Sequence, residues 1–436
     1  MTRRSPFILM CFMALTHAAA SPRLCGQDRQ RPDDGPPITW DTLGQRIDDA
    51  VAAGFAGTIL VARDGEVILH EAYGMANREL SVANTPDTIY GIGSTPIDFT
   101  RAGILLLAQE DALTLHDPIT KYFEDVPDDK KAITIDHLMS GRSGLRDFHD
   151  LPTDRDPDHS WIDRDEAVHR IMAQDLLFAP GEGEEHSHSA WGLLAAIIEI
   201  ASGQSYPTFL KERFFTPLGM TATGFFGEAF PDARVAIGYG QRRDGAINTP
   251  SHWGPTSWLV MGSGGMVSNP GDLYRWNQAM RGGEVLKPRW RGRYFAPPGA
   301  FFNGGDMYGF ETYYTEGPGS LMILCSNAGE NMGVIRRLAR GLYGLVSAEL
   351  RPKFSLGISM RVDDGTIVVD QVAPGSAAER DGLQSGDRLI SAGGTPLGDR
   401  PMVVLDPLLR SGDAIRFEIE RNGERRTVVV TPDPRS

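Results

Sequence analysis

Apolar residues follow two different spacings along the larger, N-terminal part of the chain. Two apolar runs flank Asp64-Gly65 within residues 57–69, a pattern typical of an antiparallel hairpin. Strand patterns return much later, at 264–268 and 321–326. Helical spacing is found in four segments, at 43–51, 102–108, 133–139 and 192–201. Strands from both ends of this part around a helical middle predict an α+β fold, an antiparallel sheet flanked by helices.

The C-terminal part of the chain has the pattern of a second, smaller domain. An apolar strand at 366–369 precedes a short predicted helix over 376–382. Apolar and charged residues alternate over 415–420, and the turn Asn422-Gly423 leads to a last apolar strand at 428–430. These elements fill about 80 residues, which is a plausible size for an independent domain.

Residues 1–20 have the composition of a secretory signal peptide. Two arginines precede an apolar run over 6–15, and alanines at 18–20 supply a small-residue cleavage site. Residues 21–36 are rich in Pro, Asp, Arg and Gln and predict a disordered leader. We therefore expect an exported protein, either periplasmic or secreted, and no later stretch is long and apolar enough to span a membrane.

The net charge of the chain and the spacing of its histidines argue against nucleic acid and metal ions as ligands. The chain has 43 Lys and Arg against 57 Asp and Glu, a net charge of −14, which disfavours nucleic acid as a ligand. His149, His159 and His169 have spacings that match no usual metal site. The sequence therefore predicts neither a metal nor another cofactor.

Ser94 is the candidate nucleophile. It follows Gly93 and precedes the apolar helical run at 102–108. A serine at a helix N-terminus lies near free backbone N–H groups and the positive end of the helix dipole, which favours acyl-transfer chemistry. An ordinary N-cap serine occupies the same position, so the local pattern leaves both interpretations open.

Ordered motifs over residues 38–348 resemble the serine β-lactamase and penicillin-binding-protein superfamily, in its class C-like, esterase-like branch. The matching motifs are Ala83-Asn84-Thr85-Pro86-Asp87-Thr88-Ile89-Tyr90, Gly93-Ser94, Leu115-His116-Asp117-Pro118-Ile119, Ser143-Gly144-Leu145, Pro180-Gly181, Pro217-Leu218-Gly219-Met220 and Gly264-Gly265-Met266-Val267-Ser268. The resemblance implies that residues 37–348 form a β-lactamase/transpeptidase-like domain, and that this domain includes a helical subdomain.

The C-terminal part resembles a PDZ domain of the bacterial envelope type, which we place at residues 352–436. Its motifs are Pro374-Gly375-Ser376-Ala377-Ala378, Gly382-Leu383 and Ser385-Gly386-Asp387. The loop that such domains use to bind a peptide carboxylate corresponds to Ser355, Leu356, Gly357 and Ile358. The resemblance implies an extended or C-terminal peptide as the ligand, added as a strand.

The resemblance also implies three catalytic motifs, and all three are altered here. The lysine expected three residues after Ser94, the usual proton acceptor, is Ile97. The Tyr-x-Asn motif corresponds to His186-Ser187-His188, so His186 replaces the tyrosine and His188 the asparagine. The third motif, Lys-Thr-Gly or His-x-Gly, is best matched by Thr315-Glu316-Gly317, and Pro318-Gly319-Ser320 then runs almost directly into the next strand.

Two hypotheses follow from these motifs. The first, which the sequence favours, is an inactive or impaired β-lactamase-like binding or scaffolding protein, with a small ligand in its cleft and a peptide at the PDZ domain. The second is a divergent serine hydrolase, esterase- or peptidase-like, in which His186 serves Ser94 as general base, because histidine accepts protons near neutral pH.

Overall fold

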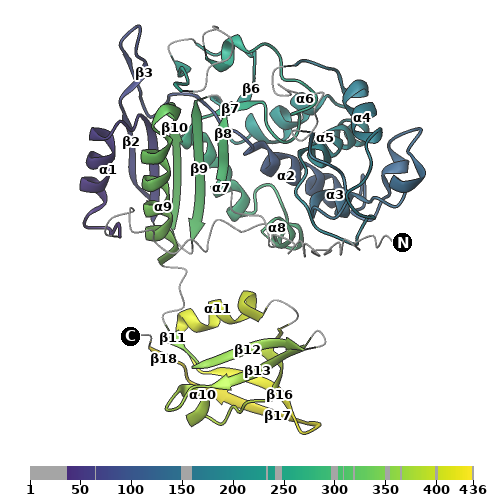
Figure 1. Cartoon of the computed structure of the whole chain (residues 1–436), viewed down its shortest axis with the longest axis vertical. Coiled ribbons are helices and arrows are strands. Elements are labelled where there is room, and N and C mark those ends of the chain that lie inside the picture. The colour runs from purple at the N-terminus through teal and green to yellow at the C-terminus, as the bar shows by residue number, and fades with distance from the viewer. Residues whose placement is uncertain are drawn as a thin grey trace, which may run out of the picture. The chain divides into compact units, whose positions relative to one another are not determined.

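The computed structural model describes residues 37–63, 65–148, 160–231, 234–240, 248–295, 303–307, 309–317, 320–348, 354–363, 366–397 and 401–434 (Figure 1). The predicted signal peptide and leader lie outside the described residues, as do His149 and His159.

A five-stranded antiparallel sheet forms the frame of the first domain. Its strand order is β2-β1-β10-β9-β8, built from Glu66–Tyr73, Gly57–Arg63, Ser320–Ser326, Phe310–Gly317 and Asn303–Met307. The hairpin predicted around Asp64-Gly65 is β1 and β2, and β10 from the far end of the domain pairs with β1. The predicted antiparallel α+β architecture is confirmed.

The two faces of this sheet bury different apolar cores. Ile59 and Val61 of β1 face α1 (Leu43–Ala52) and α9 (Met332–Ala348), which cover one side (Figure 1). Leu60 and Ala62, their alternate neighbours, join the larger core that includes the helical middle of the chain. The alternation follows from the period of two in a strand, where successive side chains point to opposite faces.

The helical part surrounds two central buried helices, α2 (Pro96–Gln109) and α5 (His188–Ser202). They approach closely at Gly103, where a Cβ would lie 2.8 Å from Ile198 Cδ1. The remaining helices of this part are α3 (Ile135–Met139), α4 (Arg164–Met172), α6 (Tyr206–Leu210), α7 (Pro270–Gly282) and α8 (Pro288–Tyr294). Among the helices of the described ranges, none combines the length and apolarity needed to cross a bilayer.

A small three-stranded sheet connects the helical part to the segment that carries Ser94. Its order is β5-β7-β6, and the strands are Tyr90–Gly91, Met266–Ser268 and Gly224–Phe225. Thr312 of β9 donates a hydrogen bond through Oγ1 to the Gly91 carbonyl, 3.3 Å away. The large sheet is thereby linked to the strand that leads into the Ser94 turn. A further short pair joins β3 (Met75–Asn77) and β4 (Val82–Ala83).

The C-terminal domain is a separate sheet with its own core. The strand order is β12-β13-β14-β16-β17, comprising Ile358–Asp363, Thr366–Val372, Arg388–Ala392, Ile415–Arg421 and Glu424–Val430, and β15 (Thr395–Pro396) pairs with β14. A short ladder joins β11 (Phe354–Ser355) to β18 (Asp433–Pro434). Phe417, Ile419 and Val369 are fully buried in this core.

The sequence pattern predicts one of the two helices of this domain and misses the other. The predicted short helix is α10 (Ala377–Arg380), capped by Ser376, whose side chain accepts from the Glu379 N–H. The pattern did not predict α11 (Pro401–Ser411), which buries Leu405 and Leu409. Pro407 lies inside α11, and an internal proline removes a backbone hydrogen bond and normally argues against a helix.

Candidate active site

Ser94 lies on the turn between β5 and α2. Gly93 before it has a φ of +54°, a left-handed conformation that glycine adopts without strain. The Ile92 N–H donates to the Met266 carbonyl at 3.2 Å and fixes the turn against β7. The side chain of Ser94 is half-buried, and its Oγ is 3.3 Å from Nε2 of His188.

The start of α2 distinguishes Ser94 from a capping serine. The N-cap of α2 is Thr95, and Pro96 is the first helical residue. Ile97, at the position of the family lysine, is only 2% exposed and belongs to the large apolar core. The Ser94 hydroxyl is within hydrogen-bond distance of the His188 imidazole on α5. Ile97 has no amine that could take the place of this imidazole.

Asp147 completes a chain of hydrogen bonds that starts at Ser94. Its Oδ2 is 2.6 Å from His188 Nδ1 and also accepts from the His188 backbone N–H at 3.0 Å. The side chains of His188 and Asp147 are 18% and 15% exposed, so both are largely removed from water. With Asp147 ionised, its carboxylate can only accept, so the tautomer of His188 that fits both contacts carries its proton on Nδ1 and turns the Nε2 lone pair towards Ser94.

Local contacts explain why Asp147 and His188 meet. Ser187 is the N-cap of α5, and its Oγ accepts from the Ala190 N–H and donates to the Arg146 carbonyl at 3.1 Å. The segment before Asp147 is held by Gly144, whose carbonyl accepts from the Leu177 N–H at 2.8 Å. Gly144 has a φ of +77°, and a Cβ there would be 2.1 Å from the Phe178 carbonyl oxygen. These contacts hold the segment that carries Asp147 close to the first turn of α5.

The hydrogen bond expected of His186 is made by His188 instead. His188 is the first residue of α5, so its backbone and ring are both held by Asp147. His186 precedes the Ser187 cap, its side chain is exposed, and its ring packs edge-on against that of His188 with centroids 4.7 Å apart. Phe148 contacts the His188 ring as well, with centroids 5.9 Å apart.

The sequence pattern does not single out Asp147, whose contact with His188 appears only in the structure. The available signal is its position two residues after the Ser143-Gly144-Leu145 motif, in front of a buried Phe148. For His188, the signal is Ser187, a typical N-cap residue directly before an apolar helix. Neither signal by itself identifies the partner of Ser94.

A second carboxylate, Asp98, is buried one turn of α2 beyond Ser94. It is 5% exposed, and among the described residues no hydrogen-bond partner is found for its Oδ1. Burial raises the pKa of this carboxyl to about 6, and the positive charge of Arg101 acts in the opposite direction. Asp98 thus lies near the site without belonging to the Ser94–His188–Asp147 chain.

The third family motif lies on β9, the strand next to the segment that leads to Ser94. Thr315 pairs with Met322 and Gly317 with Ser320 in the β9–β10 ladder. The backbone of the motif therefore lies on a strand. Its side chains, together with Pro318 and Gly319 of the predicted short connection, lie outside the described residues.

The predicted peptide loop of the C-terminal domain joins β11 to β12. Gly357 has a φ of +74°, its carbonyl accepts from the Ala373 N–H at 2.7 Å, and its N–H donates to Ser355 Oγ at 3.2 Å. Leu356 is 4% exposed and lies in the domain core, and Ile358 begins β12. Within the described sheet β12 is an edge strand that pairs with β13 alone.

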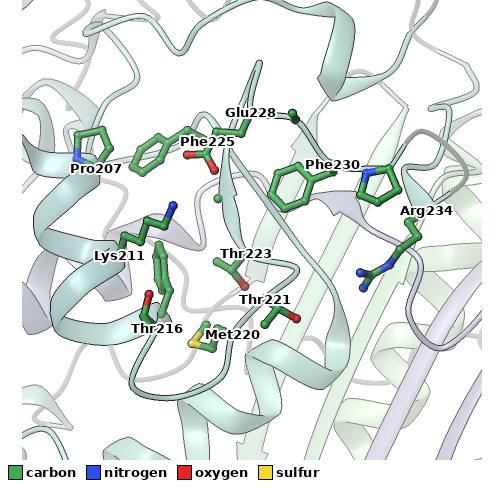
Figure 2. Close-up of a pocket in the computed structure, with 14 residues that line it drawn as sticks. Pro207, Lys211, Thr216, Met220, Thr221, Thr223, Phe225, Glu228, Phe230 and Arg234 are labelled. Atoms are coloured by element: carbon green, nitrogen blue, oxygen red, sulfur yellow. The ribbon is translucent and has the colours of Figure 1, made fainter.

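A pocket of about 390 Å³ lies between the segment that follows α6 and the loop after β6 (Figure 2). Lys211 comes from the helical side, and Arg234 lies on the opposite side of the pocket. Apolar surface is supplied by Phe225 and Phe230, and Glu228 adds a carboxylate. Ser94, Asp147 and His188 do not line this pocket, so it is a separate feature of the first domain.

Comparisons with known proteins agree with this architecture. Residues 43–333 match the beta-lactamase family and residues 355–431 the PDZ domain family. A Bacillus subtilis protein named for penicillin binding, PbpX, is 26% identical over 311 residues, 68% of this chain and 76% of the relative. A second penicillin-binding protein of that organism is 28% identical over 284 residues, 62% of this chain and 61% of the relative.

Solved structures with a similar fold include a penicillin-binding protein and an amidase. The penicillin-binding protein of Bacillus halodurans has a TM-score of 0.57 at 21% identity, covering 68% of this chain and 98% of its own. The D-amino acid amidase of Ochrobactrum anthropi, complexed with L-phenylalanine amide, has a TM-score of 0.57 at 26% identity, covering 70% and 97%. The family match spans well over half of the sequence, and the chain belongs to the beta-lactamase family of penicillin-binding-protein-like serine hydrolases, with a PDZ domain at its C-terminal end.

Proposed function

We propose that the protein is a serine hydrolase that cleaves an ester or amide with a Ser94–His188–Asp147 triad. The observation that carries this proposal is the continuous hydrogen-bonded chain from Ser94 Oγ through His188 to Asp147, with contacts of 3.3 and 2.6 Å. Nucleophile, base and orienting carboxylate are the three parts that such a triad requires. In this arrangement His188 is the proton acceptor, a function that the side chain of Ile97 cannot perform.

In the proposed reaction, Ser94 Oγ attacks the substrate carbonyl carbon while His188 Nε2 takes the hydroxyl proton. The imidazolium then gives this proton to the leaving alcohol or amine, and an acyl-serine remains. Water attacks the acyl-serine, His188 takes its proton, and the carboxylic acid departs as Ser94 is reprotonated. Asp147 keeps the proton on Nδ1 and stabilises the transient positive charge. The N-terminal end of α2 favours negative charge beside Ser94.

The altered third motif limits the proposed substrate class. Many substrates of this family carry a carboxylate, which the usual cation of the motif attracts. Here Thr315 replaces the cation and Glu316 adds a negative charge. We therefore propose a neutral or cationic ester or amide, and the likeness to the D-amino acid amidase supports the inclusion of amides.

Labelling with a fluorophosphonate tests the proposed hydrolase directly. The wild-type chain should become covalently labelled, and Ser94→Ala should lose the label entirely, because the nucleophilic oxygen is gone. Ser140→Ala is the matched control: this half-buried serine donates to the Asp136 carbonyl at 2.7 Å, and its loss should leave labelling intact. Absence of label on the folded wild-type chain, or equal label on Ser94→Ala, would contradict the proposal.

The second candidate is a binding or scaffolding protein without hydrolytic activity. Buried Ile97 at the lysine position favours it, because the family's usual proton transfer cannot operate there. This alternative predicts no serine-directed labelling with the first domain folded. The labelling experiment therefore separates the two candidates.

We further propose that the PDZ domain binds peptides through their free C-terminal carboxylate. Edge strand β12 can accept a peptide strand, and Gly357 holds the loop that leads into it. Gly357→Ala should weaken binding at least about tenfold, because a Cβ there would lie 2.2 Å from Ser376 Cβ and φ is positive. The readout is fluorescence anisotropy with a pool of peptides that end in apolar residues.

Two controls make the peptide experiment decisive. Gly386→Ala carries the same positive-φ strain, with φ +90°, but a Cβ there would meet nothing within 4 Å, so binding should persist. C-terminally amidated versions of the same peptides should bind weakly. Equal binding of free and amidated peptides, or undiminished binding by a folded Gly357→Ala domain, would refute carboxylate recognition by this loop.

Export is a proposal that rests on the composition of residues 1–20. Expression in a Gram-negative host should place the chain outside the cytoplasm with a new N-terminus near residue 21. Recovery of the full-length chain from the cytoplasm alone would count against it.

A further inference from the structure

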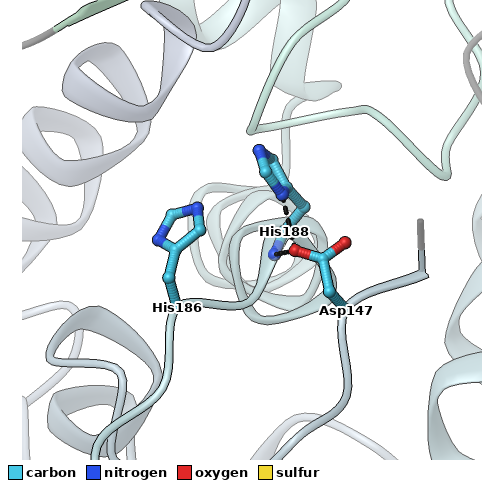
Figure 3. A group of neighbouring side chains, drawn as sticks. All are labelled: Asp147, His186 and His188. Carbon is cyan, nitrogen blue, oxygen red and sulfur yellow. Dashed lines mark hydrogen bonds and ion pairs between the residues drawn. The ribbon is translucent and has the colours of Figure 1, made fainter. Parts of the chain in front are cut away.

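Three side chains around the site form a cluster of metal-binding type. One ligand atom each of Asp147, His186 and His188 lies within 4.8 Å of the other two. Figure 3 shows the two histidines and the carboxylate converging from two segments, with His188 between its partners at the start of α5. His186, which the proposed triad does not use, is the exposed member.

The ligand set suits a zinc-type ion. Imidazole nitrogen and carboxylate oxygen are normal zinc ligands at 2.0–2.2 Å, and three protein ligands leave one position open. Ligands of a tetrahedral zinc are roughly 3.3 Å apart. To bind such an ion, Asp147 Oδ2 and His188 Nδ1, now 2.6 Å apart, must move slightly away from each other. The His186 ring must move towards them, which its exposed position permits. We propose that Asp147, His186 and His188 bind a zinc-type divalent cation.

Metal binding and the triad exclude each other. If His188 binds through Nδ1, its proton moves to Nε2, which then donates to Ser94 and can no longer accept from it. If His188 binds through Nε2, the lone pair that faces Ser94 is used by the metal. In either case Ser94 loses its general base. Zinc is therefore a reversible inhibitor of the site, a consequence that rests on the proposed hydrolase function, whereas zinc binding itself does not.

Zinc binding is tested on the full chain without a polyhistidine tag, in the Ser94→Ala background, so that hydrolytic activity plays no part. Calorimetric titration with Zn²⁺ should show one site, and Co²⁺ should give the visible absorption of a tetrahedral complex. His186→Ala should weaken binding at least about tenfold, as loss of a direct ligand requires. His169→Ala, at an exposed histidine on α4, should bind as tightly as its parent.

The outcomes separate the two proposals. Absence of a zinc site, undiminished affinity in His186→Ala, or equal binding of Mg²⁺, which prefers oxygen ligands, would overturn the metal site. In the wild-type chain, Zn²⁺ should suppress fluorophosphonate labelling over the concentration range of binding, and EDTA should restore it. Zinc binding without any labelling in the metal-free chain would support the metal site and refute the hydrolase. Labelling unaffected by bound zinc would refute the inhibitory role.

Discussion

Replacing His188 with alanine is expected to reduce kcat/KM for an activated ester by about 10²–10⁴-fold, the usual worth of a general base. His186→Ala should cost far less, because the Ser94 hydroxyl is hydrogen-bonded to His188. The pair is closely matched, since the two histidines are separated by Ser187 alone and their rings are in contact. Hydrolysis of p-nitrophenyl acetate and the rate of fluorophosphonate labelling provide two independent measurements.

Asp147→Asn extends this experiment to the orienting group. An asparagine amide can donate to Nδ1 and so favour the tautomer with the proton on Nε2, which faces Ser94. In serine proteases this change lowers kcat by about 10⁴-fold, and we expect a loss of at least about 10²-fold here. The His188 backbone N–H is bonded to the same oxygen, so thermal unfolding must show that the variant is folded.

Equal losses in His186→Ala and His188→Ala would contradict the assignment of the base. A large loss in His186→Ala alone would favour the pairing that the sequence suggested. Full activity in Asp147→Asn would remove the carboxylate from the mechanism and leave a Ser94–His188 dyad.

Much of the fold could be predicted because its signals are local. The β1–β2 hairpin follows from Asp64-Gly65 between apolar runs, and the β16–β17 turn follows from Asn422-Gly423, whose φ values are +56° and +80°. Such turns need positive φ, which Asn and Gly tolerate. In contrast, α11 escaped prediction because Pro407 opposes a helix locally, while burial of Leu405 and Leu409 in the domain core favours one.

The candidate site was harder to predict because its parts meet through nonlocal contacts. Ser94, Asp147 and His188 come from three distant segments, and the approach of the last two depends on Ser187 bonding the Arg146 carbonyl. The family pattern points to the position of the tyrosine, where His186 stands, as the base. The substitution of histidine for asparagine two residues later changes which side chain is held beside Ser94, and spacing alone does not reveal that change.

Asp98 provides a prediction about stability that is independent of the triad. Its carboxyl is buried beside Arg101. Burial raises the pKa values of two tyrosines, Tyr294 and Tyr314, and the charge of Asp98 raises them further. A folded-state pKa of about 6 against an ordinary 3.8 means that the folded chain holds a proton that the unfolded chain releases. The contribution of Asp98 to the free energy of unfolding is therefore most favourable below pH 4 and falls as pH rises to about 6.

Asp98→Asn should consequently stabilise the first domain by up to about 3 kcal/mol above pH 7, by about half as much at pH 5, and by almost nothing near pH 4. The amide preserves the shape of the side chain and needs no ionisation, so the gain arises from the buried charge. Chemical unfolding monitored by tryptophan fluorescence at several pH values measures it. Asp48→Asn, at an exposed aspartate on α1, is the matched control and should show no such pH-dependent gain. A gain that is the same at pH 4 and pH 8 would mean that it does not come from ionisation of Asp98, and a loss at pH 8 would mean that the folded protein stabilises the Asp98 charge; either result would refute the buried-charge explanation.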